Sequence, residues 1–236
     1  MHDLPLLKAT FRTCGHRLAR TETVGEGRGW EDLYTVADYA AFALTRELPE
    51  LPCRAGCDGC CRAKALFQVS TREWEVVRRE IDGWPVERRE ALARHARKRH
   101  ERDRPALVAL AEAWEAEGLG ARIPVSGDVE DGCPLLGDDG LCTVYEARPL
   151  VCRAYGAFSV NLDHRPRVLI CREYGPTFLQ VMHDADMPEL PLPNYDRFVA
   201  RLKDLQPPGP IRPMALWLLI WADEMDGGEP AEPASS

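Results

Sequence analysis

The stretch Cys53-Arg54-Ala55-Gly56-Cys57-Asp58-Gly59-Cys60-Cys61 places four thiols within nine residues. A second, more widely spaced group follows it and consists of Cys133, Cys142, Cys152 and Cys171. Thiolate donors suit zinc and iron–sulfur clusters and are poor ligands for magnesium or calcium. The pattern therefore predicts a metal centre held by cysteines, and only Cys14 stands apart from both groups.

The composition excludes several classes of protein. The chain has 236 residues, of which 45% are hydrophobic, and a formal net charge of −8. It is long enough to bury a core, and it contains no run of 18 apolar residues and no apparent secretory signal. We expect a cytoplasmic protein without a membrane span. Thiols stay reduced there, which favours metal binding over a disulfide framework.

The charge also bears on partners. A negative chain has no global attraction to nucleic acid, so we expect none as a partner. The basic segment 86–104 is interpreted as a solvated helix face with internal ion pairs. A protein partner remains open, and the sequence identifies none.

A helical insert is predicted between the two cysteine groups, at about 70–118. Ser70-Thr71-Arg72-Glu73 has the spacing of a capping box and predicts the start of a helix. Gly83 and Pro85 separate this helix from the next one. Pro105 marks another helix boundary, and that helix is expected to run to Gly118.

Helices are also predicted at both ends of the chain. Apolar residues recur at helical spacing in segments 4–20 and 30–44 and again after Tyr174. The last apolar segment, 214–221, is too short to span a bilayer and is predicted to be a buried core helix. Cys14 is expected to be a small buried hydrophobic residue.

The predicted architecture is one mainly α-helical domain with minor β structure over residues 1–226. Its centre is an irregular cysteine-rich region at about 50–175 with short β-hairpins. One hairpin turns at Gly137-Asp138-Asp139-Gly140 and brings Cys133 near Cys142. Residues 227–236 are predicted to be a disordered tail.

The chain between Cys142 and Cys171 is predicted to fold locally. Segment 145–153 is expected to form a tight turn followed by one or two helical turns. A second hairpin is predicted from strands 158–161 and 168–171, with His164, Arg165 and Pro166 at its turn, and it delivers Cys171 to the centre.

The spacing of the thiols restricts how they share metals. Cys57 and Cys60 are separated by two residues, a common turn for two ligands of one metal, and Gly56 and Gly59 let the backbone curl around it. Cys60 and Cys61 are adjacent, so they suit two sites or two different irons better than one ion. Three allotments stay open: two four-cysteine zinc sites, one cluster with one zinc, or one cluster with spare cysteines.

Two arginines flank Cys152 in the segment Arg148-Pro149-Leu150-Val151-Cys152-Arg153. Cationic side chains near thiolates lower thiol pKa values and offset the negative charge of a thiolate-rich site. Arg148 and Arg153 are therefore candidates for support of the centre, and ordinary ion pairing is an equal alternative. The sequence presents no catalytic nucleophile constellation.

These motifs resemble the YkgJ-type cysteine-cluster family, described as chelating zinc or iron. The matching segments are Cys-x3-Cys-x2-Cys-Cys at 53–61, Cys133-Pro134-Leu135-Leu136, Asp139-Gly140-Leu141-Cys142 and Val144–Arg153. The resemblance covers about 50–175. It implies metal ligation by Cys53, Cys57, Cys60, Cys61, Cys133, Cys142, Cys152 and Cys171.

The predicted function is metal binding, with an iron–sulfur cluster (4Fe-4S) or zinc as the cofactor. The adjacent pair Cys60-Cys61 favours the cluster. One alternative is a metal-dependent enzyme of methyl or redox transfer, implied by a cysteine cluster similar to that of flagellin lysine methylases. The other alternative is a purely structural zinc module. A pocket beside the metal favours the enzyme, and unfolding on chelation favours the module.

Overall fold

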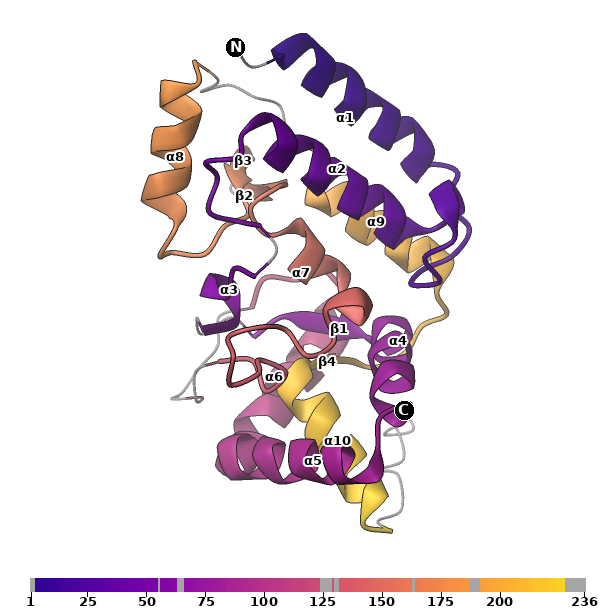
Figure 1. The fold of residues 1–236 in the computed structure, drawn as a ribbon. Helices are drawn as coiled ribbons and strands as arrows, with labels where there is room; N and C mark the ends of the chain where they lie inside the picture. Colours follow the sequence, from indigo (N-terminus) through magenta and orange to yellow (C-terminus); the bar gives the residue numbers. More distant parts are fainter. Residues whose placement is uncertain are drawn as a thin grey trace. The chain divides into compact units, whose positions relative to one another are not determined.

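The computed structural model describes residues 3–54, 56–62, 66–123, 129, 132–162, 164–186 and 192–227. These residues are mostly helical, with two short antiparallel strand pairs among them, which confirms the predicted fold class. The chain divides into two compact units (Figure 1). The first comprises Met1–Ala63 and Arg148–Pro207, and the second Lys64–Ala147 and Pro208–Ser236. The single domain over 1–226 stays a prediction, and the predicted tail from 228 onward lies outside the described residues.

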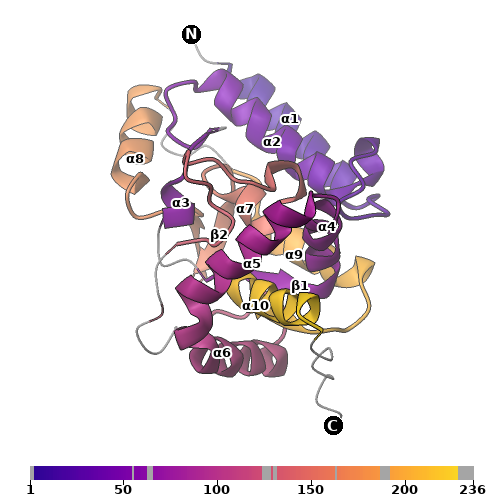
Figure 2. The ribbon, with the colours of Figure 1, turned by 60° about the horizontal axis from the view of Figure 1, so that its bottom comes forward.

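Two long helices build one side of the first unit. Helix α1 (Leu4–Leu18) packs along helix α2 (Leu33–Glu47), and the two lie side by side in Figures 1 and 2. The helices predicted at 4–20 and 30–44 are thereby confirmed. Helix α2 begins later than predicted because the 3-10 turn η1 (Gly29–Glu31) precedes it. Cys14 is fully buried on α1, as expected.

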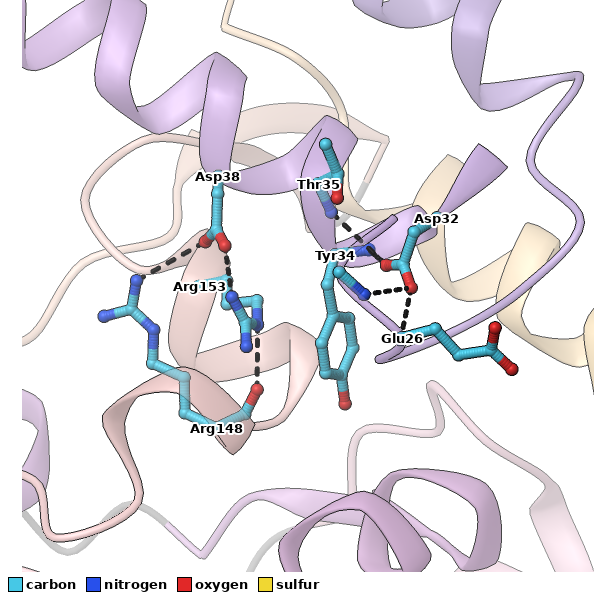
Figure 3. A network of polar contacts seen from close by, with 8 residues as sticks. Glu26, Asp32, Tyr34, Thr35, Asp38, Arg148 and Arg153 are labelled. Atoms are coloured by element: carbon cyan, nitrogen blue, oxygen red, sulfur yellow. Dashed lines mark hydrogen bonds and ion pairs between the residues drawn. The ribbon is translucent and has the colours of Figure 1, made fainter. Parts of the chain in front are cut away.

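Helix α2 is fixed at its start by Asp32, whose side chain is completely buried. One carboxylate oxygen accepts from the backbone amides of Tyr34 at 2.7 Å and Thr35 at 3.4 Å. The other oxygen accepts from the amides of Glu26 and Gly27 (Figure 3). Asp32 thus caps the helix and ties the preceding glycine-rich loop to it.

Short elements complete the first unit. Helix α7 contacts both α2 and α9, and Phe158 meets Phe198 of α9 edge to face with ring centroids 4.8 Å apart. The predicted helices after Tyr174 and the turn with a short helix at 145–153 are present. These elements are α3 (Gly59–Arg62), α7 (Leu150–Ala154), β2 (Ser159–Leu162), β3 (Arg165–Val168), α8 (Gly175–Asp184) and α9 (Tyr195–Leu205).

The hairpin of β2 and β3 differs in register from the prediction. Ser159 pairs with Val168 and Leu162 with Arg165, so β3 begins three residues earlier than expected. Arg165 and Pro166 belong to the strand and not to the turn. His164 adopts a positive φ of 61°, which lets the chain reverse within a tighter turn. Pro166 is tolerated because β3 has one paired edge.

The second unit contains the helical insert and the last helix. Helix α10 packs against α5, and Trp217 of α10 stacks on Trp74 of α4 with centroids 5.5 Å apart. Leu107, Leu216 and Leu219 share its buried core. Its elements are β1 (Gln68–Ser70), α4 (Thr71–Asp82), α5 (Val86–His100), η2 (Glu101–Asp103), α6 (Arg104–Glu117), η3 (Tyr145–Ala147), β4 (Ile211–Pro213) and α10 (Met214–Met225).

The local signals of the insert are confirmed. Ser70 and Glu73 form the capping box of α4, in which the side chain of each residue accepts from the backbone amide of the other. Pro105 lies in the first turn of α6, and Gly118 caps its end. The antiparallel pair of β1 and β4 was not predicted. Within the described part of the chain, no helix is long and apolar enough to cross a membrane.

The basic segment of the insert contains internal ion pairs, as expected, for example Arg94 with Glu90 at 3.6 Å, and it also pairs with acids of the last helix, which was not predicted. Arg97 of α5 pairs with Asp226 of the last turn at 2.7 Å. Arg104 pairs with Glu101 at 2.7 Å and with Asp223 of α10 at 3.0 Å. These contacts connect α5, η2 and α6 to α10 within the second unit.

Candidate metal centre

The first cysteine group lies in the first unit, on a turn that leads into a four-residue helix. The amide of Cys57 donates to the carbonyl of Arg54 at 2.9 Å, and Gly56 takes a positive φ of 87° between them. The amide of Cys61 donates to the carbonyl of Asp58, also at 2.9 Å. Helix α3 therefore carries both Cys60 and Cys61, and Cys53 and Cys57 precede it.

Cys152 and Cys171 come from a different part of the first unit. Pro149 starts α7, and its carbonyl accepts from the amide of Cys152 at 3.0 Å. Cys171 is buried, and its carbonyl accepts from the amide of Gly175 at the start of α8. In the sequence, Cys152 precedes the β2–β3 hairpin and Cys171 follows it, and each lies at a turn.

Two glycines show how closely the segments approach. A Cβ built on Gly156 would come within 2.1 Å of the Cβ of Cys53 and 2.3 Å of its Sγ. A Cβ on Gly59 would come within 3.0 Å of the Sγ of Cys171 and 2.6 Å of the ring of Tyr174. The first cysteine group therefore packs directly on the chain that follows α7.

The thiols influence one another electrostatically. Burial raises the pKa of Cys53 to about 12, and the nearby thiols of Cys57 and Cys171 add to this rise. Burial also raises the pKa of Cys57, against a hydrogen bond from the backbone of Gly59 that lowers it. In the metal-free protein, both side chains are held as neutral thiols.

The adjacent pair behaves differently. A side-chain hydrogen bond between Cys60 and Cys61 raises the pKa of Cys60 and lowers that of Cys61. Burial and the thiols of Cys61, Cys152 and Cys57 raise the pKa of Cys60 further. The positive charge of Arg148 contributes to the lowered pKa of Cys61. Within the pair, the hydrogen bond therefore favours the proton on Cys60 over Cys61.

Tyr155 connects the two ligand segments. Burial raises its pKa to about 12, and the thiols of Cys60, Cys152 and Cys171 contribute to the rise. One phenol is therefore within electrostatic reach of thiols from α3, from α7 and from the segment before α8. Six predicted site residues thus lie in the first unit, each within electrostatic reach of at least one other: Cys53, Cys57, Cys60, Cys61, Cys152 and Cys171.

The other two predicted ligands lie in the second unit. The amide of Leu136 donates to the carbonyl of Cys133 at 3.1 Å, and Leu136 forms a β-bridge with Cys142. This confirms the predicted hairpin around residues 137–140. Across the described residues, no three His, Cys, Asp or Glu side chains already stand in an arrangement that could hold a metal ion.

A network of polar contacts supports the segment that carries Cys152 (Figure 3). Asp38 of α2 accepts from Arg148 at 3.4 Å and forms a close ion pair with Arg153. The guanidinium of Arg153 is buried and lies 4.1 Å from the ring centroid of Tyr34. Arg148 is ion-paired, as one alternative predicted, and its positive charge contributes to the lowered pKa of Cys61; a role in supporting a metal centre stays a prediction. Asp38 was missed, since a lone acid in an amphipathic helix carries no local signal.

An open hollow lies beside the first cysteine group. It has a volume of about 450 Å³ and is lined by Gly59, Arg62, Arg172 and Glu173. Arg62 is ion-paired with Asp58 at 2.5 Å. The volume falls within the range of small-molecule sites, and a Cβ built on Gly59 would lie 3.0 Å from the Sγ of Cys171. No sequence pattern indicated this hollow.

Comparison with protein families gives one match. The family model is CxxCxxCC, "Putative zinc- or iron-chelating domain", and it matches residues 52–174. Searches of curated proteins and of solved structures give no significant match. The match covers more than half of the chain and includes both cysteine groups. The predicted relationship to a cysteine-cluster family is confirmed, and the chain belongs to the CxxCxxCC family of metal-chelating domains.

Proposed function

We propose that the protein binds an iron–sulfur cluster through thiolates of its first unit. The observation that carries the proposal is the mutual electrostatic influence of six thiols from separate segments of that unit. The thiolates of such a group are the ligands that soft metals prefer. Family membership supports metal binding and leaves zinc and iron as the two candidates.

The number and arrangement of the thiols favour a cluster over a single zinc ion. A structural zinc takes four ligands in a tetrahedron, and the first unit offers six of the predicted ligand thiols. Cys60 and Cys61 are adjacent on α3, where successive side chains diverge by about 100°. In a 4Fe-4S cluster each thiolate binds its own iron, so neighbouring residues need not converge on one ion. Four of the six ligate, and two support them.

We include Cys133 and Cys142 in the proposal as further ligands. Cys142 lies in the β-bridge of their hairpin opposite Leu136, and Cys133 lies three residues before that bridge. The family match extends over both residues. The number of metal ions bound per chain distinguishes ligation by Cys133 and Cys142 from ligation by the first unit alone.

Metal and acid-labile sulfide analysis of protein purified without oxygen tests the proposal. We expect iron, sulfide and a broad absorption band near about 400 nm. Serine at Cys60 and Cys152 should abolish the band, and Cys14→Ala should leave it intact. Colourless protein that binds only zinc and unfolds on chelation would refute the cluster and favour the structural zinc module.

A metal-dependent enzyme of redox or methyl transfer is the second candidate. The hollow at Gly59 favours it, because a small substrate bound there would lie beside the buried Cys171. Arg172 and Glu173 supply one charge of each sign for its recognition. The test is whether small charged molecules perturb the metal spectrum of the wild type and fail to do so with Arg172→Ala.

A further inference from the structure

We propose that the hollow beside the first cysteine group binds a small zwitterion, a molecule that carries one carboxylate and one ammonium group, as a free amino acid does. Arg172 binds the carboxylate, and Glu173 binds the ammonium group. The inference deepens the second candidate function, and it rests on that function for the position of the site. It does not depend on which metal the protein binds.

The lining of the hollow is the first observation. One lining residue, Gly59, is buried and has no side chain, and the other three are exposed and charged, namely Arg62, Arg172 and Glu173. The volume of about 450 Å³ lies within the range of small-molecule sites. Because the lining side chains are charged, the hollow suits a charged ligand better than an apolar one.

The second observation is which of these charges are available to a ligand. Arg62 already has a partner, since Asp58 lies 2.5 Å from its guanidinium. Among the residues that the structure describes, the side chains of Arg172 and Glu173 form no ion pair or hydrogen bond. They are neighbours of opposite charge, yet they do not pair with each other. The hollow therefore offers one available cation and one available anion.

The turn that carries both charges is fixed without a ligand. The amide of Gly175 donates to the carbonyl of Cys171 at 3.1 Å, which closes the turn around the two charged residues. The residue after them, Tyr174, packs its ring on Gly59, where an added Cβ would lie 2.6 Å from it. A backbone that is already held by such contacts lowers the entropy cost of binding.

The pair of charges determines the class of ligand. A carboxylate pairs with a guanidinium, and an ammonium group donates to a carboxylate. A simple anion would leave Glu173 unpaired, and a simple cation would leave Arg172 unpaired. A zwitterion pairs with both. Since an exposed ion pair raises affinity by up to about fivefold, a zwitterion should bind more tightly than a molecule with only one of its charges.

Titrations followed by saturation-transfer NMR test the inference on the protein as purified. The probes are glycine and β-alanine, two zwitterions that differ in the spacing of their charges. Acetate and methylamine are the single-charge controls for glycine, and propionate and ethylamine are those for β-alanine. At least one zwitterion should bind about threefold more tightly than both of its controls. Equal dissociation constants within both series would overturn the proposal.

Substitutions assign the two charges. Arg172→Gln should reduce the affinity for the zwitterion to that of its ammonium control, and Glu173→Gln should reduce it to that of its carboxylate control. Arg172→Lys keeps the charge and should retain most of the affinity. Arg165→Gln and Glu22→Gln are the matched control variants, because both residues are exposed in the first unit and do not line the hollow. Equal affinities in the hollow variants and the control variants would overturn the proposal.

The outcome is separate from that of the metal assignment. Metal and sulfide analysis of the same preparation decides between cluster and zinc, and the titrations involve no turnover. A preference for the zwitterion that is lost in the hollow variants supports the inference with either metal. Absence of that preference overturns the inference and leaves metal binding intact.

Discussion

Cys53 and Gly156 lie against each other so closely that no side chain fits at Gly156. The Cβ it lacks would stand 2.1 Å from the Cβ of Cys53, far inside contact distance. Gly156 also takes a positive φ of 78°, a conformation that costs other residues about 1–2 kcal/mol. Cys53, the first predicted ligand, thus packs directly on the backbone of the segment after α7.

Alanine at Gly156 is therefore expected to displace Cys53 and to lower metal content. The strain and the clash together should reduce the free energy of unfolding by more than about 2 kcal/mol. Metal analysis and thermal unfolding measure both effects. Gly15→Ala on α1 is the control, since no atom lies within 4 Å of its added Cβ. That variant should keep its metal and gain up to about 1 kcal/mol; equal behaviour of the two variants would contradict the expectation.

Asp38→Asn should destabilise the first unit even without metal. The substitution leaves the buried guanidinium of Arg153 without its anionic partner. Because Asp38 itself is partly exposed, we expect a loss of about 1–3 kcal/mol, below the value for a fully buried pair. Denaturant unfolding of the metal-free protein gives the number. Removal of an exposed pair by Arg94→Gln should change stability by less than about 0.5 kcal/mol.

The buried cap of α2 should matter more than the exposed cap of α1. Asp32 accepts four backbone amide hydrogen bonds, whereas Asp3 accepts one from Leu6. We expect Asp32→Ala to cost about 2 kcal/mol or more and Asp3→Ala about 0.5–1 kcal/mol. Chemical unfolding of the two variants side by side measures the difference. Similar losses would mean that the hydrogen bonds between Asp32 and the loop before α2 do not contribute to the free energy of unfolding.

Cys14 should make the stability depend on alkaline pH. Burial raises the pKa of its thiol from 9.0 to about 11. The folded state keeps this proton where the unfolded state loses it, so the contribution is complete below pH 9 and disappears as the pH rises toward 11. The total effect is about 2–3 kcal/mol. Unfolding curves of the wild type and Cys14→Ala between pH 8 and about 11 should converge as the pH rises; parallel curves would exclude the effect.

Local patterns predicted the helices of this protein well. The capping box at Ser70 and Glu73, the break at Gly83 and the helix start at Pro105 depend on residues close in sequence, and each is present. The hairpin of β2 and β3 was predicted at the correct place, but its second strand begins three residues earlier than predicted. Proline at position 166 suggested a turn, and the positive φ of His164 allowed the chain to reverse earlier.

Contacts between distant segments could not be read from the sequence. β1 and β4 are three residues each and pair across the whole insert, with no pattern long enough to identify either strand. The same holds for the site: the spacing of the cysteines identified the ligand candidates, whereas Asp38 and the hollow at Gly59 arise only when α2, α3 and the chain after Cys171 come together.

The order of the segments would give a metal bound at the proposed centre a second role as a cross-link. Cys61 and Cys152 belong to one compact unit, yet about ninety residues of chain separate them, most of them assigned to the other unit. A centre that binds both thiolates closes that loop, as a disulfide of the same span would, and such closure is worth about 4–5 kcal/mol of unfolded-state entropy. Release of such a metal would thus remove the closure of the loop between Cys61 and Cys152, the longest segment of chain that leaves the first unit and returns to it.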